Sequence, residues 1–136
     1  MSNLERTLSI IKPDAVERNL TGDIKNIFIK NNFKILKSKK IHILKEEAAE
    51  FYKVHQARPF YDDLCAYLSS GPIFVMVLEG NGAVALNRKL MGATEPKNAE
   101  PNTIRKLYGI SIDKNSIHGS DSIENAKIEI DFFFKD

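Results

Sequence analysis

Two short apolar runs dominate the pattern of hydrophobic and polar residues along this chain. The first covers Thr7–Ile11 and ends at Lys12-Pro13, and the second, Ile73–Leu78, follows the Gly71-Pro72 turn. Apolar runs of this length that are bounded by Gly or Pro are typical of buried strands. The second run is apolar at every position, which predicts a central strand covered on both faces.

Two other segments have a weaker strand pattern. Phe33–Ile43 is rich in Ile and Lys, which favours a strand with one exposed side. Lys37–Lys40 interrupts the alternation, so the pattern does not fix the register of this strand. Ser116–His118 is long enough for a short edge strand.

Apolar residues with helical spacing occupy much of the remaining chain. The predicted helices are one from Thr21 onward, Lys45–Gln56, Tyr61–Leu68, Asn81–Met91 and one opened by Asp121. Thr21-Gly22-Asp23 contains residue types that cap helix N-termini, and Asp121 with Glu124 has the spacing of a capping box.

These elements predict an α+β sandwich, because strands alternate with helices and two separate helices lie between the second and third strands. At 136 residues, without a linker or an internal repeat, the chain is expected to form one domain over residues 1–136. The last helix should turn Ile123, Ala126 and Ile130 inward. Gly92–Asn115 is expected to be mostly loop, with one helical turn near Ile104.

Composition and charge are those of an ordinary folded protein. Hydrophobic residues make up 43% of the chain and charged residues 28%, and the net charge is +2. A charge so close to neutral does not favour nucleic acid as the main partner. The one cysteine, Cys65, cannot form an internal disulfide, and no apolar stretch has the length of a signal or membrane span. We therefore expect a cytoplasmic protein without membrane attachment.

Three histidines are candidates for chemistry. His42 lies in a strand-like Ile-His-Ile sequence and is expected to face solvent. His55 shares a helical stripe with Tyr52, where it would either line a site or cap the helix end. His118 precedes Gly119-Ser120-Asp121 at a strand-to-helix turn, where the backbone can approach a ligand and a helix N-terminus favours an anion.

His118 would be a competent nucleophile if an acceptor held its second ring nitrogen. Glu129 is the candidate acceptor, because it lies on the following predicted helix, away from the apolar stripe. This spacing by itself does not separate a nucleophile from an ordinary loop histidine.

Isolated cations are a second indication of a site that binds phosphate. Lys12 follows the first predicted strand, and Arg58, Arg88 and Arg105 lie at helix ends or in loops, where phosphate-binding groups are common. For each of them alone, solvated surface charge is the favoured interpretation. The chain contains neither a GxxxxGKS/T nor a GxGxxG loop, so side chains would have to neutralise the phosphates of any bound nucleotide. Cys65 is expected to pack in the core, and no His/Cys cluster has metal-ligand spacing.

The sequence around His118 resembles the signature of nucleoside diphosphate kinases. Asn115–Asp121 matches the NxxHGSD motif of that family. Further matching blocks follow the family's order, namely Thr7–Val16, Arg58-Pro59-Phe60, Ser70–Gly80 and Met91–Thr94. Because the blocks cover nearly the whole chain in register, the resemblance is highly specific.

The resemblance implies a role for individual residues. His118 would be the phosphoacceptor, reacting at Nδ1, and Glu129 would orient its ring. The phosphates would be held by Lys12, Tyr52, Arg88, Thr94 and Arg105, of which Lys12 and Tyr52 also count as catalytic.

The nucleoside would be held by other positions. The resemblance assigns the sugar hydroxyls to Asn115 with Lys12 and the base to the ring of Phe60, with Leu64 close by and Ile112 on the other face of the base. Stacking alone does not distinguish bases, so broad acceptance of ribo- and deoxynucleotides is expected.

The family also implies a fold and a mechanism. The fold is a ferredoxin-like βαββαβ sandwich with a four-stranded antiparallel sheet, and members assemble as tetramers or hexamers. The mechanism moves the γ-phosphate of a nucleoside triphosphate, mainly ATP, to nucleoside diphosphates by ping-pong kinetics. Mg²⁺ would be carried by the nucleotide phosphates, with no metal ligand from the protein.

The chain departs from the family beside Arg105. Asn102 stands where many relatives have glycine, and Lys106-Leu107 where many have a small residue and aspartate. These changes concern the geometry of the loop and subunit contacts.

Two alternatives to a kinase stay open at this point. A nucleotide-binding protein without turnover is opposed by the intact set His118, Lys12, Asn115 and Glu129. A nucleic-acid-binding module is suggested only by Lys34, Lys37, Lys39 and Lys40, which a solvated strand face explains better.

Overall fold

The computed structural model describes residues 4–53, 56–111 and 114–134 of the chain. Its strands are β1 (Leu4–Ile11), β2 (Lys34–Ile41), β3 (Ile73–Asn81) and β4 (Ile117–Gly119). They form one four-stranded sheet in the order β2-β3-β1-β4, and every neighbouring pair is antiparallel. The predicted α+β fold with a ferredoxin-like antiparallel sheet is confirmed.

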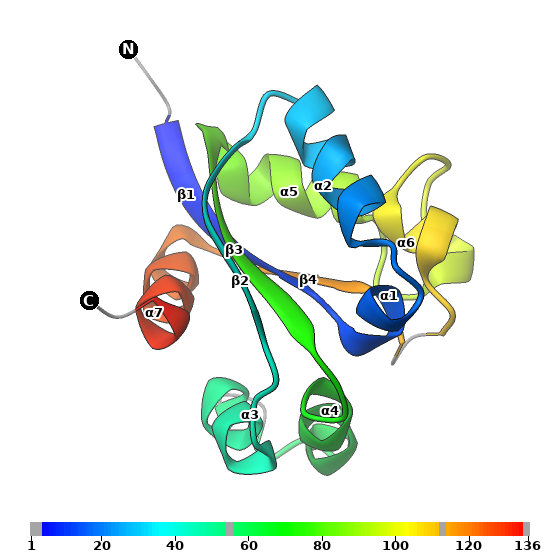
Figure 1. Ribbon diagram of the computed structural model, residues 1–136, viewed down its shortest axis with the longest axis vertical. Helices are drawn as coiled ribbons and strands as arrows, with labels where there is room; N and C mark the ends of the chain where they lie inside the picture. The colour runs from blue at the N-terminus through cyan, green and yellow to red at the C-terminus, as the bar shows by residue number, and fades with distance from the viewer. Residues whose placement is uncertain (1–3, 54–55, 112–113, 135–136) are drawn as a thin grey trace.

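Helices cover both faces of the sheet (Figure 1). One face carries α3 (Lys45–Phe51), α4 (Tyr61–Leu68) and α7 (Ile123–Phe133). The other face carries α1 (Pro13–Glu17), α2 (Thr21–Lys30), α5 (Ala83–Met91) and α6 (Ile104–Tyr108). A 3-10 turn, η2 (Pro96–Asn98), lies between α5 and α6.

Two hydrophobic cores, one on each face, hold the helices to the sheet. Along β3, Val75 packs with residues of α3, α4 and α7, whereas Met76 and Leu78 pack with the helices of the other face. Successive side chains of a strand point to opposite faces, so a strand covered on both sides is apolar throughout. This arrangement explains the run Ile73–Leu78 and confirms that β3 is a central strand.

β2 is the edge strand beside β3, and it is irregular. A register shift between Ile35 and Lys37 marks a β-bulge. A bulge adds one residue to its strand, which reverses the faces that the following side chains take. The interrupted alternation in Lys37–Lys40 is therefore a local insertion in a real strand, and these lysines are exposed to solvent.

Two predicted helix caps are wrong by one position. α2 begins at Thr21 and takes Leu20 as its N-cap, without a side-chain capping bond. α7 takes Ser122, whose extended backbone suits an N-cap and whose hydroxyl accepts from the backbone N–H of Asn125 at 3.0 Å. Asp121, the predicted cap, instead accepts from the side chain of Asn125 at 2.6 Å.

The ends of other elements also differ from the prediction. α3 ends at Phe51, before the predicted end at Gln56, and positions 54 and 55 lie outside the described residues. α5 begins at Ala83, since β3 continues to residue 81. Ile123, predicted to face inward, is the first residue of α7 and is 59% exposed, whereas Ala126 is buried as expected.

The segment predicted to be mostly loop contains η2 and α6, the latter at the position expected for a helical turn near Ile104. Asn102, just before α6, has a φ of 69°. This left-handed conformation favours glycine and is tolerated by asparagine better than by most residues. The departure at Asn102 therefore preserves the backbone that a glycine would allow.

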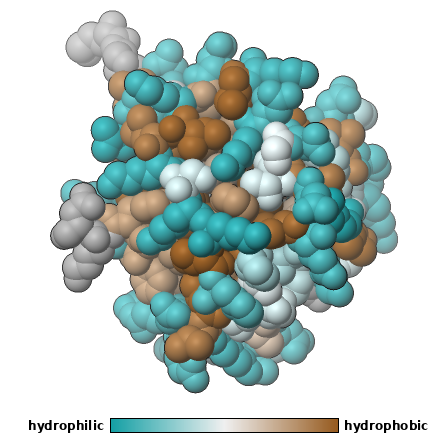
Figure 2. Space-filling model, viewed as in Figure 1, coloured by the Kyte–Doolittle hydropathy of each residue, from teal (hydrophilic) through white to brown (hydrophobic). Residues whose placement is uncertain are grey.

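The surface of the molecule is mixed in character. Figure 2 shows hydrophilic side chains over most of one face, with hydrophobic ones in separate patches. Exposed apolar residues such as Leu44 and Ile128 are common on protein surfaces. Among the helices of the described ranges, none is both long and apolar enough to cross a membrane.

Candidate active site

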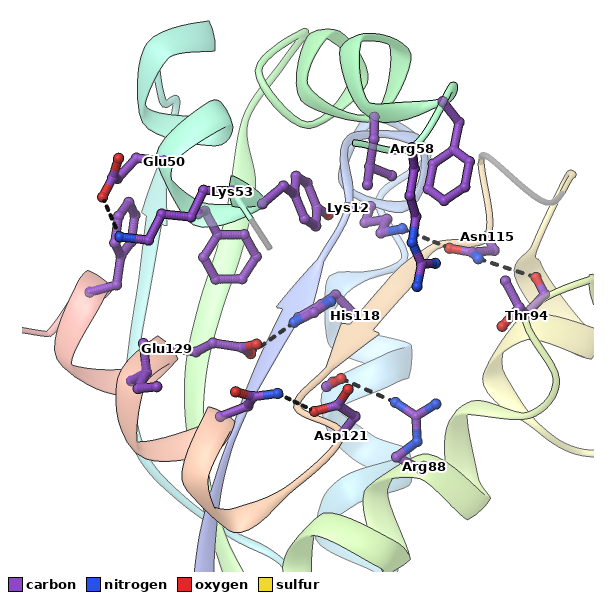
Figure 3. Close-up of a pocket in the computed structure, with 18 of the residues that line it drawn as sticks. Lys12, Glu50, Lys53, Arg58, Arg88, Thr94, Asn115, His118, Asp121 and Glu129 are labelled. Carbon is purple, nitrogen blue, oxygen red and sulfur yellow. Dashed lines mark hydrogen bonds and ion pairs between the residues drawn. The ribbon is translucent and has the colours of Figure 1, made fainter. Parts of the chain in front are cut away.

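A cavity of about 730 Å³ opens beside β4, between helices of both faces. Nine residues for which the sequence predicted a catalytic or binding role line this cavity. These residues are Lys12, Tyr52, Phe60, Arg88, Thr94, Arg105, Asn115, His118 and Glu129. The structure thus brings together positions spread from the first strand to the last helix (Figure 3).

His118 is the central residue of β4 and is held from α7. Its Nε2 atom lies 2.9 Å from Oε1 of Glu129. The same carboxylate oxygen accepts from the hydroxyl of Ser120 at 2.8 Å. The backbone of Ser120 is in turn tied to β1, because its N–H donates to the carbonyl of Leu8 at 3.2 Å. The imidazole therefore has its Nε2 side fixed and its Nδ1 side turned away from the carboxylate.

Aromatic rings pack against the imidazole. The ring centroid of Phe51 lies 5.3 Å from that of His118 and that of Tyr52 lies 6.3 Å away, both in edge-to-face arrangements. Tyr52 is 5% exposed, and burial raises the pKa of its hydroxyl above the ordinary value, with Glu129 contributing. These contacts limit rotation of the imidazole, so its orientation is largely preset.

Two arginines approach the cavity from the face of the sheet that carries α5 and α6. Arg105 is 7% exposed and donates to the carbonyls of Gly92 and Ile117 at 3.0 and 2.9 Å. Burial lowers the pKa of Arg105 to about 10, with Arg88 contributing, so the guanidinium group of Arg105 is charged at neutral pH. Arg88 donates weakly to the carbonyl of Gly119 at 3.4 Å.

A third cation comes from the end of β1. Lys12 is 6% exposed, and its Nζ donates to the side-chain oxygen of Asn115 at 2.9 Å. The amide nitrogen of Asn115 donates to the carbonyl of Thr94 at 3.1 Å, as Figure 3 shows. This chain of contacts joins three of the predicted binding residues on one wall of the cavity.

Phe60 lies at the open side of the cavity. The residue is 43% exposed, and the guanidinium of Arg58 lies 5.7 Å from the ring centroid. Leu64 also lines the cavity, as predicted. Ile112, predicted to lie on the other face of the base, falls outside the described residues.

The other candidate residues lie away from this site or outside the described ranges. His42 is exposed just after β2, as expected, and one ring nitrogen lies 2.8 Å from the carbonyl of Ser69. His55 is outside the described residues. Cys65 packs in the core, and burial raises the pKa of its thiol. Within the described ranges, no three His, Cys, Asp or Glu residues gather as a metal site would require.

Ser120 and Phe51, which both contact the side chains of the His118–Glu129 pair, were not predicted from the sequence. Ser120 stands inside the NxxHGSD motif, so its position next to His118 was a usable signal. Phe51 gave no such signal, because an apolar residue on a helical stripe is typical of the hydrophobic core. Both act on the orientation of the imidazole.

A histidine with one nitrogen held by a carboxylate, in a cavity that Lys12, Arg88 and Arg105 also line, can act as a nucleophile toward a phosphate group. Comparison with known proteins agrees with this class of site. The family model described as nucleoside diphosphate kinase matches residues 5–136. A nucleoside diphosphate kinase from Rhizorhabdus wittichii is 59% identical over 96% of this chain and 94% of its own length. One from Nitratiruptor sp. is 58% identical over 96% of each chain.

Solved structures of nucleoside diphosphate kinases also match this chain. The nucleoside diphosphate kinase of Aquifex aeolicus superposes with a TM-score of 0.96 at 44% identity, covering 97% of this chain and 96% of that one. The Halobacterium salinarum enzyme in complex with CDP has a TM-score of 0.93 at 42% identity, covering 97% and 88%.

The fold and the matches therefore define a phosphotransferase with a nucleotide-binding site. The chain belongs to the nucleoside diphosphate kinase family.

Proposed function

We propose that this protein transfers the γ-phosphate of a nucleoside triphosphate, mainly ATP, to nucleoside diphosphates through a phosphohistidine on His118. The observation that carries the proposal is the 2.9 Å contact between Nε2 of His118 and Glu129. This contact selects the tautomer with a proton on Nε2, which leaves the lone pair on Nδ1 available as the nucleophile.

The first half-reaction starts from neutral His118. Nδ1 attacks the γ-phosphorus, a nitrogen–phosphorus bond forms, and the bond to the β–γ bridging oxygen breaks. The nucleoside diphosphate leaves with that electron pair. Glu129 stabilises the positive charge that develops on the imidazole, as a carboxylate does for a histidine base. In the second half-reaction, a terminal oxygen of another diphosphate takes the phosphoryl group and restores the free imidazole, which gives ping-pong kinetics.

Catalysis in this mechanism consists of alignment and charge stabilisation, because phosphoryl transfer has a loose transition state. Arg88, Arg105 and Lys12 provide positive charge for the phosphates. Thr94 and the buried hydroxyl of Tyr52 provide further hydrogen bonds. Each charge-assisted contact is worth about 1.5–3 kcal/mol, so the loss of one would weaken the reaction without abolishing it.

Mg²⁺ is proposed to enter with the nucleotide. The ion prefers oxygen ligands and commonly keeps several waters while it binds substrate phosphates. The cavity fits such a complex, since its lining includes Lys12, Arg88 and Arg105, which would hold the phosphates that carry the ion. When bound, the ion would neutralise part of the charge of the phosphates.

The nucleoside is proposed to bind toward the open side of the cavity. Phe60 would stack on the base, and Asn115 with Lys12 would contact the sugar hydroxyls. A partly exposed ring without base-edge contacts offers little discrimination, so we propose broad use of bases and of ribo and deoxy sugars. The complex of the Halobacterium salinarum relative with CDP is compatible with this role.

We further propose a single-domain, cytoplasmic protein that assembles as a homotetramer or homohexamer. The family resemblance supports the assembly, with the segment Gly92–Ile112 at subunit contacts. The lone, buried Cys65 is compatible with a reducing compartment. Nucleic acid and membranes are not proposed as partners.

The decisive experiment is incubation with γ-labelled ATP and Mg²⁺ without an acceptor, followed by location of the label. The expected product is an acid-labile, base-stable phosphate on His118. His118→Ala should abolish labelling and exchange while nucleotide binding largely survives, and His42→Ala, a change at an exposed histidine, should do neither. Nucleotide binding by a wild-type protein that never acquires the label would instead favour a binding protein without turnover.

A further inference from the structure

Asp14 is a buried carboxylate for which the proposed function has no use. It lies in α1, is 5% exposed, and stands outside the lining of the cavity. The hydroxyl of Tyr67 donates to Oδ1, and Arg18 and Ser116 donate to Oδ2 at 3.0 and 2.7 Å. A buried charge persists only where such partners replace its hydration. Both carboxylate oxygens of Asp14 therefore accept hydrogen bonds from protein side chains.

The partners of Asp14 come from segments far apart in the chain. Tyr67 belongs to α4, and Ser116 immediately precedes β4. Arg18 also donates to the carbonyl of Tyr108, the last residue of α6. One carboxylate and its arginine therefore join α1 to α4, α6 and the start of β4. Of these, α6 contributes a cation to the cavity and β4 contributes the imidazole.

Ser116 has an unusual backbone. Its φ is 76°, in the left-handed region that residues other than glycine adopt infrequently, and the residue is fully buried. Three contacts hold it there. Its hydroxyl donates to Asp14 and accepts from Arg18 at 3.3 Å, and its carbonyl accepts from the backbone N–H of Lys12 at 2.9 Å. The residue on one side is Asn115, which contacts the Lys12 side chain, and β4 begins on the other.

We infer that Asp14 is a positioning residue for phosphoryl transfer: by holding the hydroxyl of Ser116, it fixes the backbone between Asn115 and His118. The inference rests on the proposed function, because it concerns how fast His118 takes up the phosphoryl group. Asn115 and His118 sit one and two residues from Ser116, so a change in its φ moves them relative to Lys12. A displacement of about 1 Å in reacting groups can lower a rate roughly 100-fold.

Three variants separate positioning from simple stabilisation. Ser116→Ala removes the contacts of Asp14 and its partner Arg18 with the segment before β4. Asp14→Asn removes the charge of Asp14 at constant size. Tyr67→Phe is the matched control, since it removes a hydroxyl that donates to the same carboxylate on the α4 side and accepts from the backbone N–H of Asp14 at 2.9 Å. For each, single-turnover labelling with γ-labelled ATP gives the rate of phosphohistidine formation per folded molecule. Nucleotide Kd and Tm are measured alongside.

We expect Asp14→Asn and Ser116→Ala to form phosphohistidine about 10–100-fold more slowly, with a smaller change in Kd. Tyr67→Phe should lower Tm and keep the wild-type rate. Equal slowing by Ser116→Ala and Tyr67→Phe, or a wild-type rate in Asp14→Asn, would overturn the inference. If Asp14→Asn does not fold, the comparison of the two hydroxyl deletions decides alone. A wild-type protein that is never labelled overturns the proposed function itself, whereas labelled wild type with an unchanged Ser116→Ala rate overturns only the role of Asp14.

Discussion

Oε1 of Glu129 lies 2.9 Å from Nε2 of His118, although the two residues belong to different elements, α7 and β4. The same oxygen accepts from Ser120, which follows β4. The Ser120 hydroxyl is therefore a second donor that holds the carboxylate in position beside the imidazole. In the proposed mechanism, this pair decides both the tautomer of the histidine and the charge that the imidazole can carry during transfer.

Glu129→Gln tests the charge of this pair while it retains the shape of the side chain. A hydrogen bond to a charged group is worth about 1.5–3 kcal/mol, so phosphohistidine formation should slow by roughly 10–150-fold. Nucleotide affinity should change little, because Glu129 faces the imidazole. Single-turnover labelling measures the rate. Glu124→Gln, at an exposed position of the same helix, is the control and should keep the wild-type rate.

Phe60→Ala tests the proposed base-stacking position. Stacking on an aromatic ring is worth about 1–3 kcal/mol per base, so the Kd for nucleotides should rise by roughly 5–150-fold. The loss should be similar for adenine, guanine, cytosine and thymine nucleotides, because every base has a π-face. Titrations with the four nucleotides give the comparison. A loss confined to one base would mean that Phe60 reads base identity, against the broad specificity proposed.

Gly119→Ala tests the close packing of β4 against α5. A Cβ at position 119 would overlap the side-chain amide of Asn87 and the sulfur of Met91, both on α5. Overpacking of this kind typically costs about 1–3 kcal/mol, and any relief must move α5, which also carries Arg88. We expect a lower free energy of unfolding in chemical denaturation together with slower labelling of His118.

Gly22→Ala is the matched control for this substitution. A Cβ at Gly22 meets no atom within 4 Å, and the residue lies in the first turn of α2. Alanine there should be neutral or stabilising by up to about 1 kcal/mol. If both variants lost stability equally, the tight contact between β4 and α5 would have no energetic consequence.

The sequence predicted the features that have local causes. The run Ile73–Leu78 is apolar at each position because β3 is covered on both faces, and that pattern needs no knowledge of its neighbours. α4 was predicted with its observed bounds, Tyr61–Leu68. His118 was found through a motif in which histidine, glycine and serine are adjacent.

Features that depend on distant contacts could not be predicted. Asp14 and Ser116 are 102 positions apart, so nothing in the local pattern of either residue indicates their hydrogen bond. α1 was missed because it is only five residues long, too short to show helical periodicity, although Pro13 suits a first helical turn. The choice of Ser122 over Asp121 as N-cap depends on backbone angles that residue types alone leave open.

The raised pKa values of two tyrosines predict how the free energy of unfolding changes at alkaline pH. Burial raises the pKa of Tyr52 and Tyr67 above the ordinary value of 10.0, and the hydrogen bond to Asp14 raises that of Tyr67 further. Above pH 10 the unfolded chain therefore releases protons that the folded chain retains. The stabilisation is complete below about pH 10 and is lost as the pH rises toward the folded-state values, by at most about 1.4 kcal/mol per pH unit for each tyrosine.

Tyr67→Phe isolates one of these contributions, because lysines and other tyrosines titrate alike in both proteins. Near neutral pH the wild type should be more stable by about 1–3 kcal/mol, since the variant leaves the buried carboxylate of Asp14 without one donor. Above pH 10 this difference should shrink, because only the wild type has a Tyr67 proton to lose on unfolding. Urea denaturation from pH 7 to 11 measures it. A difference that stays constant over this range would show that the Tyr67 hydroxyl titrates in the folded protein as it does in the unfolded chain.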